Sequence, residues 1–151
     1  MREKKWEKTA GIYSIGYEKK DIDLFLDLLV QNEIGLLVDV RHNPFSMKFA
    51  FTKSNLVRSL KNAGIGYLHV PELGIDGKYR KNLKNEKQRE ELFAFYSRAI
   101  LANIDEKIHE FAELGKRKRI ALMCFEADKI HCHRGILAEK LEEMGMEVKH
   151  I

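Results

Sequence analysis

The chain has 151 residues, of which 44% are hydrophobic and 33% are charged, and its formal net charge is +4 at pH 7. This size and composition predict one domain over residues 1–151, with residues 1–9 as a flexible or peripheral N-terminal segment. No apolar run approaches the roughly 20 residues of a membrane span, and the first residues lack the apolar core of a signal peptide. We therefore expect a soluble, cytoplasmic protein without membrane contacts. Two cysteines are too few for the disulfide framework of a secreted protein, so reduced thiols are expected.

Short apolar runs alternate with amphipathic segments along the chain, an order typical of β-α-β units. Strands are expected at residues 11–15, 36–40, 66–70, 120–125 and 147–151. Helices are expected at residues 22–31, from 52 or 54 to 63, over 86–114 with a break near 103, and at 134–144. The predicted fold is a Rossmann-like three-layer α/β sandwich, in which a mainly parallel sheet of about five strands has helices on both faces. The pattern leaves the strand order open.

Local signals support several element boundaries. Asp21 precedes the first helix as an N-cap, and Gly64 follows the second helix where a C-terminal cap belongs. Residues 71–85 form a polar, basic loop, whose length favours a lid or a binding loop over a plain connection.

Polar residues follow each of the first four expected strands. They include Tyr17 after the first strand, Arg41 after the second, Glu72 after the third and the segment 123–135 after the fourth. Open parallel sheets bind ligands outside the carboxyl ends of their strands. The sequence therefore predicts one shared site at this edge of the sheet.

The segment 123–135 is the most chemically dense part of the chain, with two cysteines, two histidines, two carboxylates and an arginine. Glu126, at the end of a strand, is a candidate general acid or base, although a carboxylate there can also pair with an arginine. His133 and Arg134 stand where a helix begins and can grip a phosphate. Equally, they can satisfy carboxylates such as Asp39 and Glu126.

The same segment permits thiol or metal chemistry. Cys132 is better placed than Cys124 for activation by a helix N-terminus, and Cys124 fits a small buried core residue. A metal such as Zn²⁺ would find its donors in one set of residues: Cys124, His131, Cys132 and His133. Their spacing matches no complete metal signature, so the sequence requires no cofactor.

The second strand carries charges inside an apolar run. Asp39 and Arg41 lie on the same side of this strand and can form a buried ion pair. Alternatively, Asp39 has a shifted pKa and takes part in catalysis. Farther along, Phe45, Phe49 and Phe51 alternate with polar residues, which fits either a base-stacking surface or a hydrophobic flap.

Four ordered motifs resemble those of the domain of unknown function 488 family: Ser-Ile-Gly-Tyr-Glu at 14–18, Leu-Val-Asp-Val-Arg-His-Asn-Pro-Phe-Ser at 37–46, His-Val-Pro-Glu-Leu-Gly at 69–74, and Cys-Phe-Glu-Ala-Asp at 124–128 with His-Cys-His-Arg at 131–134. The resemblance runs from about Tyr13 to Ile151 and implies motif positions without an activity. Met47 departs from the basic residue common in such proteins, and Tyr17 from the histidine of some. The Asp-Val-Arg strand end also looks like that of rhodanese-type sulfurtransferases, but no Cys loop closing on an arginine is present.

Three functions fit these observations. The first is a hydrolase or transferase acting on a phosphate-bearing or nucleic-acid-derived substrate, and it heads the ranking. The second is a thiol-dependent sulfurtransferase-like enzyme, and the third a non-catalytic module that binds nucleotides or nucleic acid. An anionic small molecule or a nucleic acid is the expected partner. The catalytic candidates are Asp39, Glu126, Cys132 and His133, and the candidates for substrate or anion contacts are Tyr17, Arg41, Glu72 and Arg134.

Overall fold

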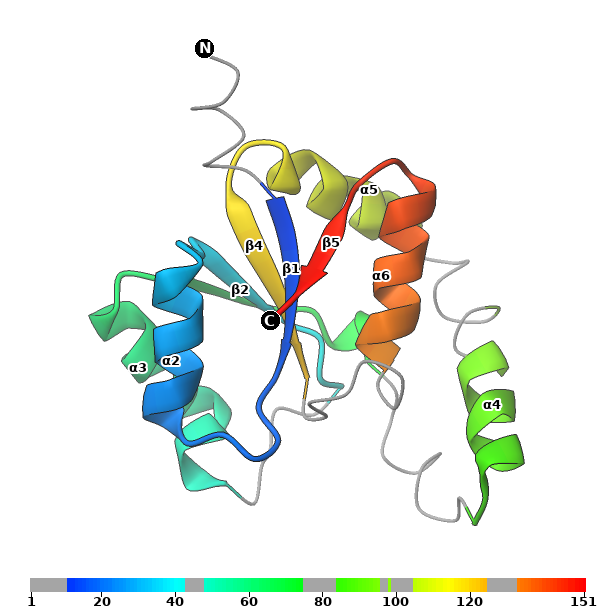
Figure 1. The fold of residues 1–151 in the computed structure, drawn as a ribbon, viewed down its shortest axis with the longest axis horizontal. Helices are drawn as coiled ribbons and strands as arrows, with labels where there is room; N and C mark the ends of the chain where they lie inside the picture. Colours follow the sequence, from blue (N-terminus) through cyan, green and yellow to red (C-terminus); the bar gives the residue numbers. More distant parts are fainter. Residues whose placement is uncertain (1–10, 43–47, 75–83, 96–97, 99–104, 125–132) are drawn as a thin grey trace.

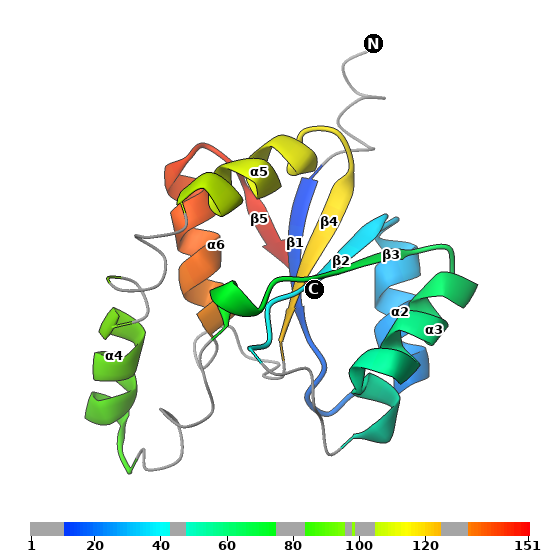
Figure 2. The same ribbon diagram turned by 180° about the vertical axis from the view of Figure 1, so that it is seen from behind.

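The computed structural model describes residues 11–42, 48–74, 84–95, 98, 105–124 and 133–151. In this part of the chain, five parallel strands form one sheet in the order β3-β2-β4-β1-β5 (Figures 1 and 2). The strands are β1 (Gly11–Gly16), β2 (Leu36–Asp39), β3 (Gly66–His69), β4 (Arg119–Cys124) and β5 (Val148–His150). The predicted parallel sheet of about five strands is confirmed.

Helices cover both faces of the sheet, as predicted for a three-layer α/β fold (Figures 1 and 2). One face carries α2 (Ile22–Gln31) and α3 (Lys53–Asn62), and we call it the α2/α3 face. The opposite face carries α5 (Asp105–Gly115) and α6 (His133–Glu143), and we call it the α5/α6 face. A further helix, α4 (Glu86–Phe95), lies to the side of these layers.

Two apolar cores result from the alternation of side chains along each strand. In β4, Ile120 and Leu122 belong to the core under α5 and α6, whereas Ala121 and Met123 belong to the core under α2 and α3. The largest fully buried helix residues on the two faces are Phe111 for the first core, and Phe25, Leu29, Leu56 and Leu60 for the second. The strand β4 thus packs against apolar side chains on both faces of the sheet.

The local signals in the sequence act as expected. The Asp21 carboxylate accepts a hydrogen bond of 2.8 Å from the Leu24 amide at the start of α2. Gly64 follows α3 with φ +75°, a conformation that favours glycine. The predicted break near residue 103 lies outside the described residues, but α4 ends before it and α5 begins after it.

Most expected boundaries differ from the structure by one or two residues. For example, β2 ends at Asp39, one residue before the expected end, although the Val40 amide still donates to the Met123 carbonyl at 3.1 Å. The helix α6 begins at His133, one residue earlier than expected. Part of the expected loop after β3 forms the 3₁₀ turn η2 (Pro71–Leu73). Within the parts of the chain described above, no helix has the length and apolar character needed to cross a membrane.

The connections that follow the strands lead to different faces of the sheet. The connections after β1 and β2 lead to α2 and α3 on one face, whereas the connection after β4 leads to α6 on the other. In the sheet, β4 lies between β1 and β2. The connection that follows β4 therefore leads to one face, whereas the connections that follow both of its neighbours lead to the other face. Such switch points are where open α/β sheets bind their ligands.

Gly74 lets η2 lie directly against the end of β2. A Cβ atom at this position would stand 2.2 Å from the His42 backbone nitrogen and 2.6 Å from the Val40 carbonyl oxygen. Backbone atoms cannot move aside as a flexible side chain can, so only glycine fits. The buried Leu73 completes the contact from the side of the core.

Replacing Gly74 by alanine should therefore destabilise the protein by about 1–3 kcal/mol, the usual cost of overpacking. Urea unfolding measures the effect. Gly35→Ala is the control, because its Cβ would meet only the Arg119 carbonyl at 3.8 Å, an ordinary contact. Equal stability of the two variants would contradict the close approach.

Candidate functional site at the carboxyl end of the sheet

The register of the strands brings their carboxyl ends together. Asp39 of β2 lies opposite His69 of β3 and Met123 of β4, and Gly16 of β1 lies opposite Cys124. We call the residues that follow these ends, 16–21, 40–42 and 70–74, the carboxyl rim. The predicted convergence of the first three strand ends is confirmed. The segment 125–132, which follows β4, lies outside the described residues.

The centre of this region is an ion pair between Asp39 and Arg41. The side chain of Asp39 is fully buried and that of Arg41 is 6% exposed. The Arg41 guanidinium donates two parallel hydrogen bonds to the carboxylate, from Nε at 2.9 Å and from Nη2 at 2.7 Å. The Arg41 backbone amide adds a third bond at 3.1 Å. The residues face the same side of the chain, so the ion-pair interpretation of this motif is the one that the structure shows.

Neighbouring elements complete the network. The Tyr67 hydroxyl on β3 donates to the Asp39 carboxylate at 2.6 Å. The Nη1 of Arg41 donates to the Phe51 carbonyl at 2.8 Å and to the Tyr17 hydroxyl at 3.4 Å. The Tyr17 and Phe51 rings stack with centroids 4.5 Å apart. One carboxylate and one guanidinium thus tie together the ends of β1, β2 and β3 and the 3₁₀ turn η1 (Phe49–Phe51).

The electrostatics of the pair keep Arg41 charged. Burial works against the charge, but the hydrogen bonds and the negative charge of Asp39 outweigh it, and the pKa of Arg41 lies above its ordinary value. For Tyr67, by contrast, burial raises the pKa. The hydrogen bond to Asp39 and the negative charge of Asp39 raise it further. Tyr67 therefore stays protonated and keeps donating to the carboxylate.

These contacts bear on the roles predicted for three residues. The four hydrogen bonds to Asp39 use both carboxylate oxygens, and those from the Arg41 side chain use four of its five N–H groups. Tyr17 is only 3% exposed. Catalysis by Asp39 and ligand binding by Arg41 or Tyr17 remain predictions, whereas their contacts give all three a structural role.

Two histidines and a glutamate lie at this edge of the sheet, His42 and Glu72 in the carboxyl rim and His69 at the end of β3. His69 is half-buried, and its Nε2 donates to the Arg41 carbonyl at 2.7 Å. His42 is exposed, and its Nδ1 lies 3.3 Å from the Pro71 carbonyl oxygen. Glu72, the next residue in η2, is exposed. Of the predicted contact residues whose side chains are described, Glu72 is thus the one that faces solvent.

The three phenylalanines of the second connection differ in their surroundings. Phe51 is 1% exposed and meets the Phe25 ring edge-on at 5.1 Å, so it is a core residue. Phe49 is 77% exposed, and Phe45 lies outside the described residues. Lys48 reaches back to the first connection, donating to the Lys20 carbonyl at 2.8 Å. Because it is buried, Phe51 can belong neither to a base-stacking surface nor to a hydrophobic flap.

The structure describes the chemically dense segment 123–135 only at its two ends. Glu126, His131 and Cys132 lie outside the described residues. The backbone places Cys124 at the end of β4 and His133 and Arg134 in the first turn of α6, without a description of their side chains. Among the side chains that are described, no group of three His, Cys, Asp or Glu residues could hold a metal ion.

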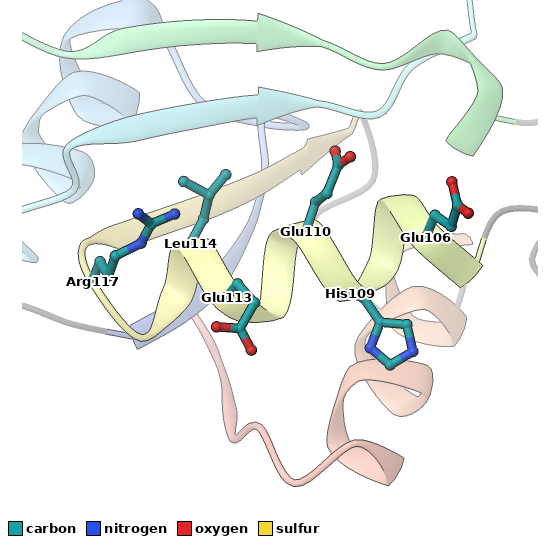
Figure 3. A pocket seen from close by; sticks show the side chains of 6 residues that line it. All are labelled: Glu106, His109, Glu110, Glu113, Leu114 and Arg117. Carbon is teal, nitrogen blue, oxygen red and sulfur yellow. The ribbon is translucent and has the colours of Figure 1, made fainter.

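A hollow that is separate from the carboxyl rim lies along α5. This open groove of about 570 Å³ is lined by residues of α5 and the turn that follows it: Glu106, His109, Glu110, Glu113, Leu114 and Arg117 (Figure 3). Two of its carboxylates pair with lysines of the same helix or its end, Glu113 with Lys116 at 3.0 Å and Glu110 with Lys107 at 4.0 Å. The groove involves none of the rim residues, and no pattern in the sequence predicted it.

The hydrogen bond from Tyr67 to Asp39 could have been predicted only if the order of the strands in the sheet had been known. Tyr67 stands two residues before His69 on β3, so it points to the same side as Asp39 once β3 is known to pair with β2. The contact between the His42 ring and the Pro71 carbonyl could not be predicted for the same reason. Both contacts depend on which strands are neighbours.

The fold and the rim define a parallel α/β protein whose strand ends are tied together by a buried Asp-Arg pair. A family model described as "Domain of unknown function DUF488" matches residues 21–141, which is most of the chain. The protein belongs to this family, as its motifs indicated. Searches of curated proteins and of solved structures gave no match.

Replacing Tyr67 by phenylalanine removes a hydrogen bond to a charged acceptor and should cost about 1.5–3 kcal/mol of stability near neutral pH. The pKa of Tyr67 is raised on folding, so its contribution is complete below the ordinary tyrosine pKa of about 10 and is lost as the pH rises above that value. The difference in free energy of unfolding between wild type and variant should therefore stay constant up to about pH 10 and shrink above it.

Urea unfolding at a series of pH values measures this difference. Tyr13→Phe is the matched control, since the Tyr13 ring lies against Arg119 instead of the Asp-Arg pair. A difference that stays constant well above pH 10 would contradict the hydrogen bond from Tyr67 to Asp39.

Proposed function

We propose that this protein is a small enzyme, a hydrolase or transferase, that binds a phosphate-bearing or nucleic-acid-derived substrate at the carboxyl end of the sheet. The observation that carries the proposal is the position of β4 at the switch point of the sheet. Its carboxyl end lies between those of β1 and β2 and leads, through residues 125–132, to α6 on the opposite face. Ligands of open α/β sheets bind at such points.

The residue types around β4 support an anionic substrate. His133 and Arg134 belong to the first turn of α6, where unpaired backbone amides and the positive end of the helix dipole favour negative charge. Arginine adds bidentate recognition of phosphate oxygens. A net charge of +4 agrees with an anionic partner.

The chemistry is proposed for residues of the dense segment. Glu126 comes two residues after the end of β4 in the sequence and is the candidate general acid or base, with His133 as a second proton-transferring group. In this proposal Asp39 and Arg41 have a supporting role. Their hydrogen bonds to each other and to Tyr67 and Phe51 fix the end of β2, the neighbour of β4 in the sheet, relative to β3 and η1.

The test compares turnover and binding in three variants. Purified protein is incubated with nucleoside mono-, di- and triphosphates, and release of phosphate or free base is measured. Glu126→Gln should lower turnover at least about hundredfold, the lower range of general acid-base catalysis, and leave nucleotide affinity within about threefold. Glu143→Gln, at the far end of α6, is the matched control and should behave as wild type.

The double variant Cys124→Ser, Cys132→Ser separates acid-base from thiol chemistry. Full activity in this variant is the expected result. Loss of activity there, with Glu126→Gln unaffected, would contradict the proposal and support a sulfurtransferase-like enzyme. Nucleotide binding without any turnover would identify a binding module instead.

A further inference from the structure

The helices α2 and α3 carry charges of opposite sign. The charged residues of α2 are both acidic, Asp23 and Asp27. Those of α3 are all basic: Lys53, Arg58 and Lys61. All five are exposed, and the two helices lie side by side on one face of the sheet (Figures 1 and 2). The outer surface of α2, α3 and the adjoining η1, which we call the outer helix surface, thus has an acidic half and a basic half.

The central charge of each helix points away from the sheet. Each helix has two buried residues that pack on the core: Phe25 and Leu29 in α2, and Leu56 and Leu60 in α3. Asp27 and Arg58 each stand two residues from both buried residues of their own helix. Because successive residues are about 100° apart around a helix, this spacing places both charges on the solvent side. Each is also the sixth residue of a ten-residue helix, so the two charges lie equally far along their helices.

The charges of the two helices do not pair with each other within one molecule. Among the described residues, no ion pair joins α2 to α3. Asp27 accepts a hydrogen bond of 3.5 Å from the Gln31 side chain of the same helix. Both halves of the outer helix surface therefore remain available to a partner.

The same surface exposes large apolar side chains. Of the five large hydrophobic residues that are exposed in the described part of the chain, three belong to it: Leu24 and Val30 of α2, and Phe49 of η1. Leu24 and Val30 are each about half exposed, at 48% and 53%, and Phe49 is exposed more than either. Large apolar groups that gather on a charged surface are typical of protein interfaces. The partner therefore has to bury apolar groups as well as match charges.

We propose that the outer helix surface is the interface of a homodimer, in which the acidic helix of each copy packs on the basic helix of the other. A two-fold axis that runs along the helices, midway between α2 and α3, places α2 of one copy over α3 of its partner and α3 over α2 in the same operation. Asp27 of each copy then meets Arg58 of the other, so the contact forms twice.

A second copy of the chain matches both halves of the surface at once. A partner of uniform charge, such as a nucleic acid, is attracted by the basic half and repelled by the acidic half. The two-fold contact also brings the exposed apolar residues of both copies into one interface, where their burial adds to the affinity.

Sedimentation velocity of the full chain over a range of concentrations tests the inference. The wild-type chain should dimerise with a Kd on the order of 10 µM, in the weak range for interfaces of modest size. Asp27→Arg and Arg58→Asp each replace two attractive contacts by two repulsive ones, and each should weaken the dimer at least about hundredfold. Glu139→Arg and Arg117→Asp change exposed residues outside this surface and should leave the dimer unchanged.

Mixing the two single variants gives the most specific readout. An equimolar mixture of the Asp27→Arg chain and the Arg58→Asp chain should form a heterodimer with nearly the wild-type affinity. In that pair the two new charges attract each other, and the two original charges remain matched. A chain that carries both changes should form a homodimer again for the same reason.

The apolar part of the interface has a separate variant. Phe49→Ser should weaken the dimer at least about tenfold, as the loss of an aromatic interface residue does. Leu68→Ser, on β3, is the control and should not affect the dimer. A wild-type chain that stays monomeric well above the expected Kd would overturn the inference and leave the surface to a different protein. Single variants that still dimerise, or a mixture that stays monomeric, would overturn it as well.

Discussion

The bidentate ion pair of Asp39 and Arg41 is the interaction on which the arrangement of the rim depends. A carboxylate and a guanidinium removed from water are costly unless their hydrogen bonds are satisfied. Here the requirement is met by groups from different elements, Tyr67 on β3, the Phe51 carbonyl on η1 and the Tyr17 hydroxyl after β1. The same bonds that stabilise the buried charges therefore fix three strand ends relative to one another.

The alternation of side chains along β2 places the buried charge pair and the exposed His42 on different sides of the rim. The charged residues that stand out in the sequence, Asp39 and Arg41, point into the protein, and the less conspicuous His42 faces solvent on the other side. A buried charge pair holds its neighbours at fixed distances because any movement would leave a charge unpaired. Exposed residues on a rim held in this way are the ones that can meet a ligand.

Apolar patterning was sufficient to predict the parallel sheet, the helices on both faces and the meeting of the strand ends. The i, i+2 spacing of Asp39 and Arg41 placed them on one side of the strand, and the structure shows the ion pair. The partners of the pair could not be predicted, because Tyr67 reaches Asp39 only when β3 is the neighbour of β2. Likewise, the sequence gives Phe49 and Phe51 similar surroundings, and only the packing of Phe51 on Tyr17 and Phe25 separates a core ring from an exposed one.

The most direct test of this account is a double-mutant cycle on the pair, with Asp39→Leu, Arg41→Met and the double variant compared by urea unfolding. Each single change leaves a buried charge without its partner and should cost about 3–5 kcal/mol. The double variant should be more stable than the sum of the single effects by at least about 1 kcal/mol, because it removes both charges. Single effects that add within about 0.5 kcal/mol would show that the two residues act independently, and would contradict the central place given to the pair.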